Sequence, residues 1–292
     1  MHNFKANYEI ILKVLKQISK ETLLPYQRRK PMLSDIEIIS INLTAEYLGI
    51  DSECDLFRKL PPELLSNIDR SVYNRRRRRL FPYLERIRVE LSDFLNQNED
   101  HFIIDSMPLE VCKLSRSGRS SICRDALYSS PDKGYCASQA IHYYGYKLHA
   151  TCSISGVFQS IDISPASVHD IHYLKDIKAQ LRDCTLIGDK GYLSAEYQLN
   201  LFETFNIKMD TPMRNNQKNY QKQSYIYRKS RKRIETLFSQ LCDQFMIRRN
   251  YAKTFEGFKT RILSKISALT IVQYINKTIF NRNINNIKIS II

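Results

Sequence analysis

The sequence has no tryptophan, only eight glycines in 292 residues, and no long run of apolar side chains. No stretch approaches the roughly 20 apolar residues that cross a bilayer, and the first residues lack the apolar core of a signal peptide. These absences argue against a membrane protein and predict a soluble, cytoplasmic one. Without tryptophan, an aromatic clamp for a flipped base must use tyrosine or phenylalanine.

Cysteine is present, but its spacing excludes its usual structural roles. The seven cysteines are an odd number, and none of them belongs to a C-x-x-C pair. Neither a disulfide framework nor a zinc knuckle is therefore indicated, and we expect reduced, mostly structural cysteines. At 43% hydrophobic content, the chain is apolar enough to bury a core in one larger and one smaller domain.

Basic residues outnumber acidic ones by 45 to 30, which gives a formal net charge of +15. A globular chain of this charge favours polyanionic partners, with nucleic acid ahead of an anionic membrane surface. One basic run consists of Arg75, Arg76, Arg77, Arg78 and Arg79. This run is either a solvated helix face or a phosphate-contacting surface. Because adjacent guanidinium groups repel one another without a polyanion, we favour phosphate contact, which supplies affinity rather than sequence choice.

The first hundred residues have the pattern of a helical region. Ser34 and Glu37 have the spacing of a capping box, and Gly49 follows the apolar positions of the helix that this box begins. Shorter helical stretches follow, the third of which carries the arginine run. Short helices followed by a basic one make a helix-turn-helix-like DNA-binding domain plausible over residues 1–98.

From about residue 100, short apolar runs alternate with helical stretches. The expected strands are 101–105, 143–153, 157–163, 185–189 and 207–211. The expected helices are 168–181, 194–205, 228–247 and 255–277. This order predicts an α/β sandwich around a central mixed sheet. Residues 106–142 are too long for an ordinary connection and are expected to form a functional insertion.

Two of the expected buried strands end in an acid, Asp105 and Asp189. Each aspartate taken alone is as well explained by the start of a turn. A third acid, Glu235, borders the apolar stripe of the helix at 228–247 and can point toward the sheet edge where the aspartates emerge. The alternative for Glu235 is a surface ion pair with Arg231, one helical turn earlier.

Three converging carboxylates suit magnesium, a hard ion that takes oxygen ligands from the protein and from substrate phosphates. Two such ions activate an attacking oxygen and stabilise a leaving one at phosphorus. Asp105, Asp189 and Glu235 are therefore predicted to hold two Mg²⁺ ions, for which Mn²⁺ can substitute, and to act on phosphodiesters.

Five segments resemble, in order, the motifs of bacterial DDE transposases, and in detail those of the insertion-sequence 982 group. They read IIDSMP at 103–108, YGYKLH at 144–149, VHD at 168–170, GDKGY at 188–192 and RKRIETLF at 231–238. The resemblance extends to residues 33–37, 108–124 and 211–218. It implies a ribonuclease H-like catalytic domain at 99–280, followed by a tail at 281–292. It also implies that Asp105, Asp189 and Glu235 are the catalytic acids.

The sequence departs from the family pattern around Glu235. Related transposases have a Tyr-x2-Arg-x3-Glu-x6-Lys signature; here Arg231 fits, but Tyr227 is one place too far and Cys242 replaces the lysine. Lys232, Arg233, Arg248 and Arg249 are candidates to supply the missing charge beside DNA. Lys190 is either a DNA contact or a surface lysine.

Three further residues have less specific interpretations. Asp170 is either a second acid near the metals or a helix N-terminal acid. His169 and His172 share one turn, but a pair without a third ligand is more often structural than metal-binding.

The resemblance implies a transposase that binds the terminal inverted repeats of its element, cleaves DNA and transfers the strand to target DNA. Synapsis of two ends suggests a homodimer on DNA, in the bacterial cytoplasm and at the nucleoid. Two alternatives stay open: a nuclease of the same fold that hydrolyses without joining, and a non-catalytic DNA-binding remnant of a mobile element.

Overall fold

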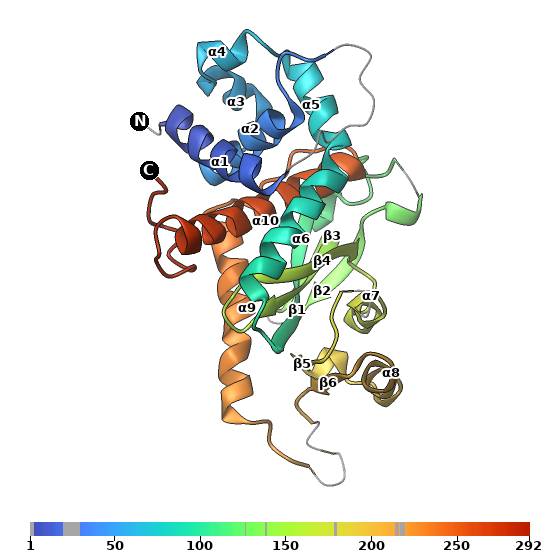
Figure 1. The fold of residues 1–292 in the computed structure, drawn as a ribbon. Coiled ribbons are helices and arrows are strands. Elements are labelled where there is room, and N and C mark those ends of the chain that lie inside the picture. The colour runs from blue at the N-terminus through green and yellow to red at the C-terminus, as the bar shows by residue number, and fades with distance from the viewer. Residues whose placement is uncertain are drawn as a thin grey trace. The chain divides into compact units, whose positions relative to one another are not determined.

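The computed structural model describes residues 3–19, 30–125, 127–137, 139–177, 180–213, 216 and 220–292. Parts of the predicted helix at 168–181 and of the 211–218 segment lie outside these ranges. The chain packs into two compact units, which we call the helical unit (Met1–Leu91 and Gln240–Ile292) and the sheet unit (Ser92–Ser239). Figure 1 shows the helices and strands that make up each of them.

The helical unit contains the helices expected near the N-terminus. They are α1 (Phe4–Ile18), α2 (Asp35–Tyr47), α3 (Glu53–Lys59), α4 (Pro62–Leu65), α5 (Arg70–Arg79) and most of α6 (Phe81–Asn96). The predicted capping box begins α2: the Glu37 backbone N–H donates to Ser34 Oγ at 3.3 Å, and the Ser34 N–H donates to Glu37 Oε2 at 2.7 Å. These two bonds satisfy donors that a helix start leaves unpaired.

The last long helix, α10 (Phe255–Thr278), belongs to the helical unit and is buried along most of its length. It packs against α2 and α5. Ile287 and Ile291 in the segment after α10 are also buried. Packing therefore joins both ends of the chain in one unit. The functional division predicted from the sequence, with boundaries at 98 and 280, stays a prediction.

The sheet unit is built on one six-stranded mixed sheet. Its strands are β1 (His101–Cys112), β2 (Asp132–Cys136), β3 (Ile141–Ser153), β4 (Phe158–Pro165), β5 (Cys184–Ile187) and β6 (Ile207–Asp210). The order is β2-β3-β1-β5-β6, and β4 also pairs with β3. The β1, β3 and β4 pairings are antiparallel, whereas β5 is parallel to both β1 and β6. The predicted hairpin is confirmed, with Gly156 at φ +96° in its turn.

Strand β1 is longer than the sequence predicted, which corrects two expectations. Asp105 lies within the strand rather than at its end, and the expected insertion at 106–142 contains the second half of β1 and all of β2. The longer strand includes Pro108, which has no backbone N–H. It is accommodated because β5 pairs with β1 only at 101–103, so one side of the later strand is an edge.

Helices cover both faces of the sheet. On one face, α7 (Leu174–Ile177) and α8 (Ala195–Phe205) contribute Leu174, Ile177 and Leu201 to the core over β1, β5 and β6. On the other face, α9 (Tyr225–Asp243) packs through Phe238, whose ring centroid is 6.2 Å from that of Phe158 of β4. The predicted α/β sandwich is thus confirmed.

The helix expected at 168–181 begins later than predicted. A 3-10 helix, η3 (Asp170–Tyr173), precedes α7. Within the parts of the chain that the structure describes, no helix is both long and apolar enough to cross a membrane.

Candidate active site

The pairing of two parallel strands brings Asp105 and Asp189 to equivalent positions. The last aligned pair of β1 and β5 is Ile103 with Ile187, and each aspartate lies two residues beyond its member of that pair. Residues two apart on extended chains share a face of the sheet. Asp189 still has extended backbone angles, φ −90° and ψ −175°. The sheet register therefore directs the two carboxylates toward one place.

Each carboxylate uses one oxygen to accept a hydrogen bond from nearby backbone. Asp105 Oδ1 accepts from the Ser106 N–H at 2.8 Å, and Asp189 Oδ1 accepts from the Gly191 N–H at 2.8 Å. Among the described residues, neither Oδ2 atom has a hydrogen-bond partner. Both side chains are partly exposed, so these oxygens are accessible. Two available carboxylate oxygens fit part of the donor set that Mg²⁺ or Mn²⁺ requires.

The electrostatics of Asp105 point to the same requirement. Burial raises the pKa of Asp105 from 3.8 to about 7, and the nearby acids Asp189 and Asp170 act in the same direction. The Ser106 N–H and the charge of Arg231 oppose this rise. A carboxylate with this environment gains from a nearby cation, because a cation favours the charged form.

A polar cluster that the sequence did not reveal surrounds Asp170, whose charge acts on Asp105. Lys147 Nζ donates to Asp170 Oδ1 at 3.0 Å and to the Val168 carbonyl oxygen at 2.8 Å. His149 Nε2 is 2.8 Å from Ser164 Oγ, and its Nδ1 is 3.9 Å from Asp170 Oδ1. Burial lowers the pKa of His149 to about 4, so this imidazole is neutral at physiological pH.

Asp170 is thus held by a lysine and also acts electrostatically on Asp105. Its motif drew attention to it, but the pairing with Lys147 depends on the β3 register, which a single sequence does not reveal. His169 is exposed and caps η3, its Nδ1 accepting the Ile171 N–H at 3.3 Å. This capping contact supports a structural role for His169 rather than a metal-binding one.

Glu235 is on α9, as predicted, directly after the buried Ile234. Its side chain is exposed, and it forms no hydrogen bond or ion pair with any residue that the structure describes. The alternative ion pair with Arg231 is therefore absent from these ranges. Within the same ranges, no three His, Cys, Asp or Glu side chains lie close enough together to hold a metal. The structure brings Asp105 and Asp189 together without Glu235.

The basic residues that the sequence analysis singled out around Asp189 and Glu235 fall into two groups. Arg231 and Arg233 are partly buried, and their charges act on Asp105 and Cys152 of the sheet, respectively. Lys232 is exposed, as is Lys190 after β5. These four side chains place positive charge both beside the aspartate pair and on the surface of the same unit.

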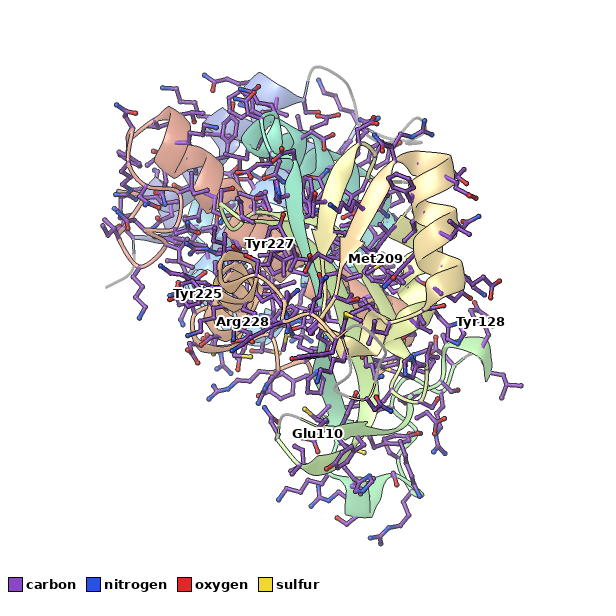
Figure 2. The ribbon with its side chains drawn as sticks, turned by 90° about the horizontal axis from the view of Figure 1, so that it is seen from below. Glu110, Tyr128, Met209, Tyr225, Tyr227 and Arg228 are labelled. Atoms are coloured by element: carbon purple, nitrogen blue, oxygen red, sulfur yellow. The ribbon has the colours of Figure 1, made fainter. Side chains whose placement is uncertain are left out.

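Tyr227, one place from the family position, anchors the start of α9 to the start of β1. Its ring centroid is 5.9 Å from that of His101, and its hydroxyl is 3.5 Å from His101 Nε2. Figure 2 shows Tyr225, Tyr227 and Arg228 grouped around this end of α9, with Glu110 at the opposite end of β1. The offset tyrosine thus has a structural contact in this chain.

The five arginines of the basic run have different environments on α5. Arg76 donates to Asp35 Oδ1 at 2.5 Å, and the buried Arg77 donates to Glu53 Oε1 at 2.7 Å. Arg75, Arg78 and Arg79 are exposed. Only these three are free to form the surface that the sequence suggested, and their DNA contact stays a prediction.

A curled mixed sheet between helices, with two aspartates at equivalent positions of parallel strands, defines a ribonuclease H-like domain. The model of the transposase DDE domain family matches residues 96–271, more than half of the chain, and the protein belongs to that family. No curated protein matches the chain significantly. The family membership supports a DNA-cleaving and strand-transferring enzyme.

Proposed function

We propose that the protein is an insertion-sequence transposase of the 982 group. It binds the terminal inverted repeats of its element, cleaves the DNA and joins the freed 3′-OH to target DNA. The observation that supports the proposal is the register of β1 and β5, since Asp105 and Asp189 each lie two residues beyond the aligned pair Ile103 and Ile187.

The proposed site holds two Mg²⁺ ions, for which Mn²⁺ can substitute. Asp105 and Asp189 share the ions through their available oxygens, and Glu235 completes the second position from α9. When bound, these ions supply activation of the attacking oxygen and stabilisation of the leaving one. Because Glu235 is exposed and has no partner among the described residues, its side chain is available for such a role.

The remaining residues of the proposed site position DNA. The charge of Arg231 acts on Asp105 and that of Arg233 on Cys152, and Lys190 and Lys232 are exposed on the same unit. We assign all four to backbone phosphates, together with the exposed arginines of α5. Joining two ends of one element requires two active sites, so the proposed form on DNA is a homodimer, located in the cytoplasm at the nucleoid.

The test is cleavage of DNA that carries the element's ends, in Mg²⁺, by wild type and Asp105→Asn. We expect the variant to be slower by about a hundredfold or more, since a catalytic ion contributes several kcal/mol to the transition state. Asp100→Asn, an exposed aspartate of the same unit, is the matched control and retains wild-type rates. Undiminished Mg²⁺-dependent cleavage by Asp105→Asn would sink the assignment.

Two other functions are separated by related assays. A nuclease of this fold would hydrolyse DNA but leave precut ends unjoined in a strand-transfer assay. A non-catalytic remnant would bind the repeats without binding Mg²⁺ or Mn²⁺. The pair of available carboxylates favours the catalytic protein over the remnant.

A further inference from the structure

The helical unit contains a basic pocket, and none of the residues that line it belongs to the sheet unit that carries Asp105 and Asp189. It has a volume of about 330 Å³ and lies among residues of α3, α5 and the start of α10. The charged and aromatic side chains that line it are Glu53, Arg77, Arg78, Tyr251, Lys253 and Arg261. Four of these six are cations and one is an acid, so the pocket has the charge to receive an anion.

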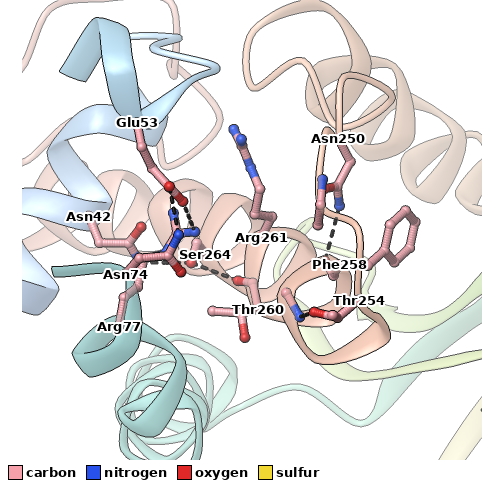
Figure 3. Close-up of polar contacts among 12 residues, drawn as sticks. Asn42, Glu53, Asn74, Arg77, Asn250, Thr254, Phe258, Thr260, Arg261 and Ser264 are labelled. Atoms are coloured by element: carbon pink, nitrogen blue, oxygen red, sulfur yellow. Dashed lines mark hydrogen bonds and ion pairs between the residues drawn. The ribbon is translucent and has the colours of Figure 1, made fainter. Parts of the chain in front are cut away.

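Arg261 is the most informative of these residues. Its side chain is only 7% exposed, yet Nε has no hydrogen-bond partner. Its one ion-pair contact among the described residues is long, 3.8 Å to Glu46 Oε1, because the other oxygen of Glu46 is held by Lys265 at 2.5 Å. Figure 3 shows the Arg261 guanidinium extending from α10 without a drawn hydrogen bond. A buried guanidinium N–H without a hydrogen-bond partner is costly, so an anionic partner that accepts from Arg261 Nε would stabilise it.

The single acid of the pocket is already matched. Glu53 Oε1 accepts from Arg77 at 2.7 Å, and its Oε2 accepts from Asn74 at 2.6 Å. Arg78 and Lys253 are exposed and form no ion pair within the described ranges. Three cations therefore remain available for a ligand, one of them buried.

The backbone adds positive potential at the same place. The 24-residue α10 begins beside the pocket, with Thr254 as its N-cap accepting the Gly257 N–H at 3.2 Å. The start of a helix carries a partial positive charge that favours phosphate groups. Asn250 holds the preceding loop to the helix through a 3.0 Å bond to the Phe258 carbonyl oxygen, which Figure 3 also shows.

We infer that this pocket binds a backbone phosphate of DNA, with Arg261 as the buried donor and Arg78 and Lys253 at its mouth. The exposed ring of Tyr251 is placed to contact the adjoining sugar or base. The inference rests on the proposed function in that it takes the polyanion to be DNA. It adds a specific phosphate site formed by residues that the arginine run alone does not identify.

The experiment measures binding of a labelled duplex oligonucleotide in EDTA at several salt concentrations, for wild type and Arg261→Gln. We expect affinity to fall about ten- to hundredfold, as for loss of hydrogen bonds to a charged group. The slope of log K against log salt should shrink by about 0.9, the value for one phosphate contact. Arg86→Gln, an exposed arginine of α6, is the control and changes affinity by about twofold or less.

Two further measurements keep the outcome decisive. Lys253→Gln alters an exposed side chain of the pocket that lies outside the arginine run, and it should reduce the salt slope even if Arg261→Gln folds poorly. Inorganic phosphate, compared with chloride at equal ionic strength, should raise the Tm of wild type but not of Arg261→Gln.

Wild-type duplex affinity and salt slope in both pocket variants would overturn the inference. A phosphate effect without a DNA effect would also overturn it, since the pocket would then take free phosphate alone. Because no metal or cleavage is involved, these results are independent of the Asp105→Asn assay. If wild type does not bind duplex at all, the proposed function fails instead.

Discussion

The buried ion pair of the helical unit and the aspartate pair of the sheet unit differ in how their negative charge is balanced. In the helical unit, Glu46 and Lys265 are both buried, and Lys265 Nζ lies 2.5 Å from Glu46 Oε2. The Lys265 ammonium also donates to the Phe245 carbonyl oxygen at 2.7 Å. In the sheet unit, Asp105 and Asp189 accept one backbone N–H each, and no cation forms an ion pair with either among the described residues. The ion pair of Glu46 and Lys265 links α2 to α10, whereas the carboxylates of Asp105 and Asp189 form a site that requires a cation.

The largest expected effect comes from breaking the matched pair. Lys265→Met should lower the free energy of unfolding by about 3–5 kcal/mol, because it leaves the Glu46 carboxylate buried without its closest cation. Urea unfolding followed by circular dichroism measures the loss. The double variant with Glu46→Leu should recover most of it, since a buried ion pair is often replaceable by apolar residues. A single variant as stable as wild type would contradict the comparison.

Removing the charge of Asp105, which has no ion-pair partner among the described residues, should raise the free energy of unfolding rather than lower it. With its pKa raised from 3.8 to about 7, Asp105 binds a proton more tightly in the folded state. Below the unfolded pKa of 3.8, Asp105 is protonated in both states and does not change the free energy of unfolding. Between that pH and the folded pKa of about 7, wild type loses stability as the pH rises. In EDTA at pH 8, Asp105→Asn should therefore be more stable by roughly 2–4 kcal/mol. The gain should shrink toward pH 4.

Thermal unfolding at several pH values measures this difference. Asp100→Asn is the control of opposite sign, because the hydrogen bond from His101 lowers the pKa of Asp100. That substitution should bring no gain at pH 8. If Asp105→Asn and wild type have equal Tm values from pH 5 to pH 8, the account of Asp105 is wrong.

The smallest effect calibrates the comparison with an exposed helix cap. Ser34→Ala removes the side-chain acceptor of the α2 capping box and should cost about 1 kcal/mol. Urea unfolding again provides the measurement, with Ser66→Ala as an exposed control. A loss as large as that of Lys265→Met would show that the helical unit is not held mainly by its buried charges.

The pairing of Asp105 and Asp189 was within reach of the sequence, because each aspartate follows an apolar run typical of a buried strand. The length of β1 was not. The apolar run stops at Asp105, whereas the strand continues because its later residues pair with β3 as far as Cys112, and a single sequence does not reveal that pairing. The link between Lys147 and Asp170 likewise depends on strand register and on η3, neither of which local patterns specify.

Long-range partners also limited the interpretation of charged residues. Five adjacent arginines look alike in the sequence, yet Arg76 and Arg77 pair with Asp35 and Glu53 of other helices. Glu235 had a local explanation in an ion pair with Arg231, and the folded helix does not form it. In both cases, tertiary packing decided which charges are available.

The central claim is that Asp105 and Asp189 form a cation site. Calorimetric titration of Mn²⁺ into wild type, Asp105→Asn and Asp189→Asn, without DNA, tests it most directly. Asp176→Asn, an aspartate of α7, serves as the matched control. We expect wild type and the control to bind Mn²⁺, and each site variant to lose at least about tenfold in affinity. Equal Mn²⁺ affinity in all four proteins, or none in wild type, would contradict the claim.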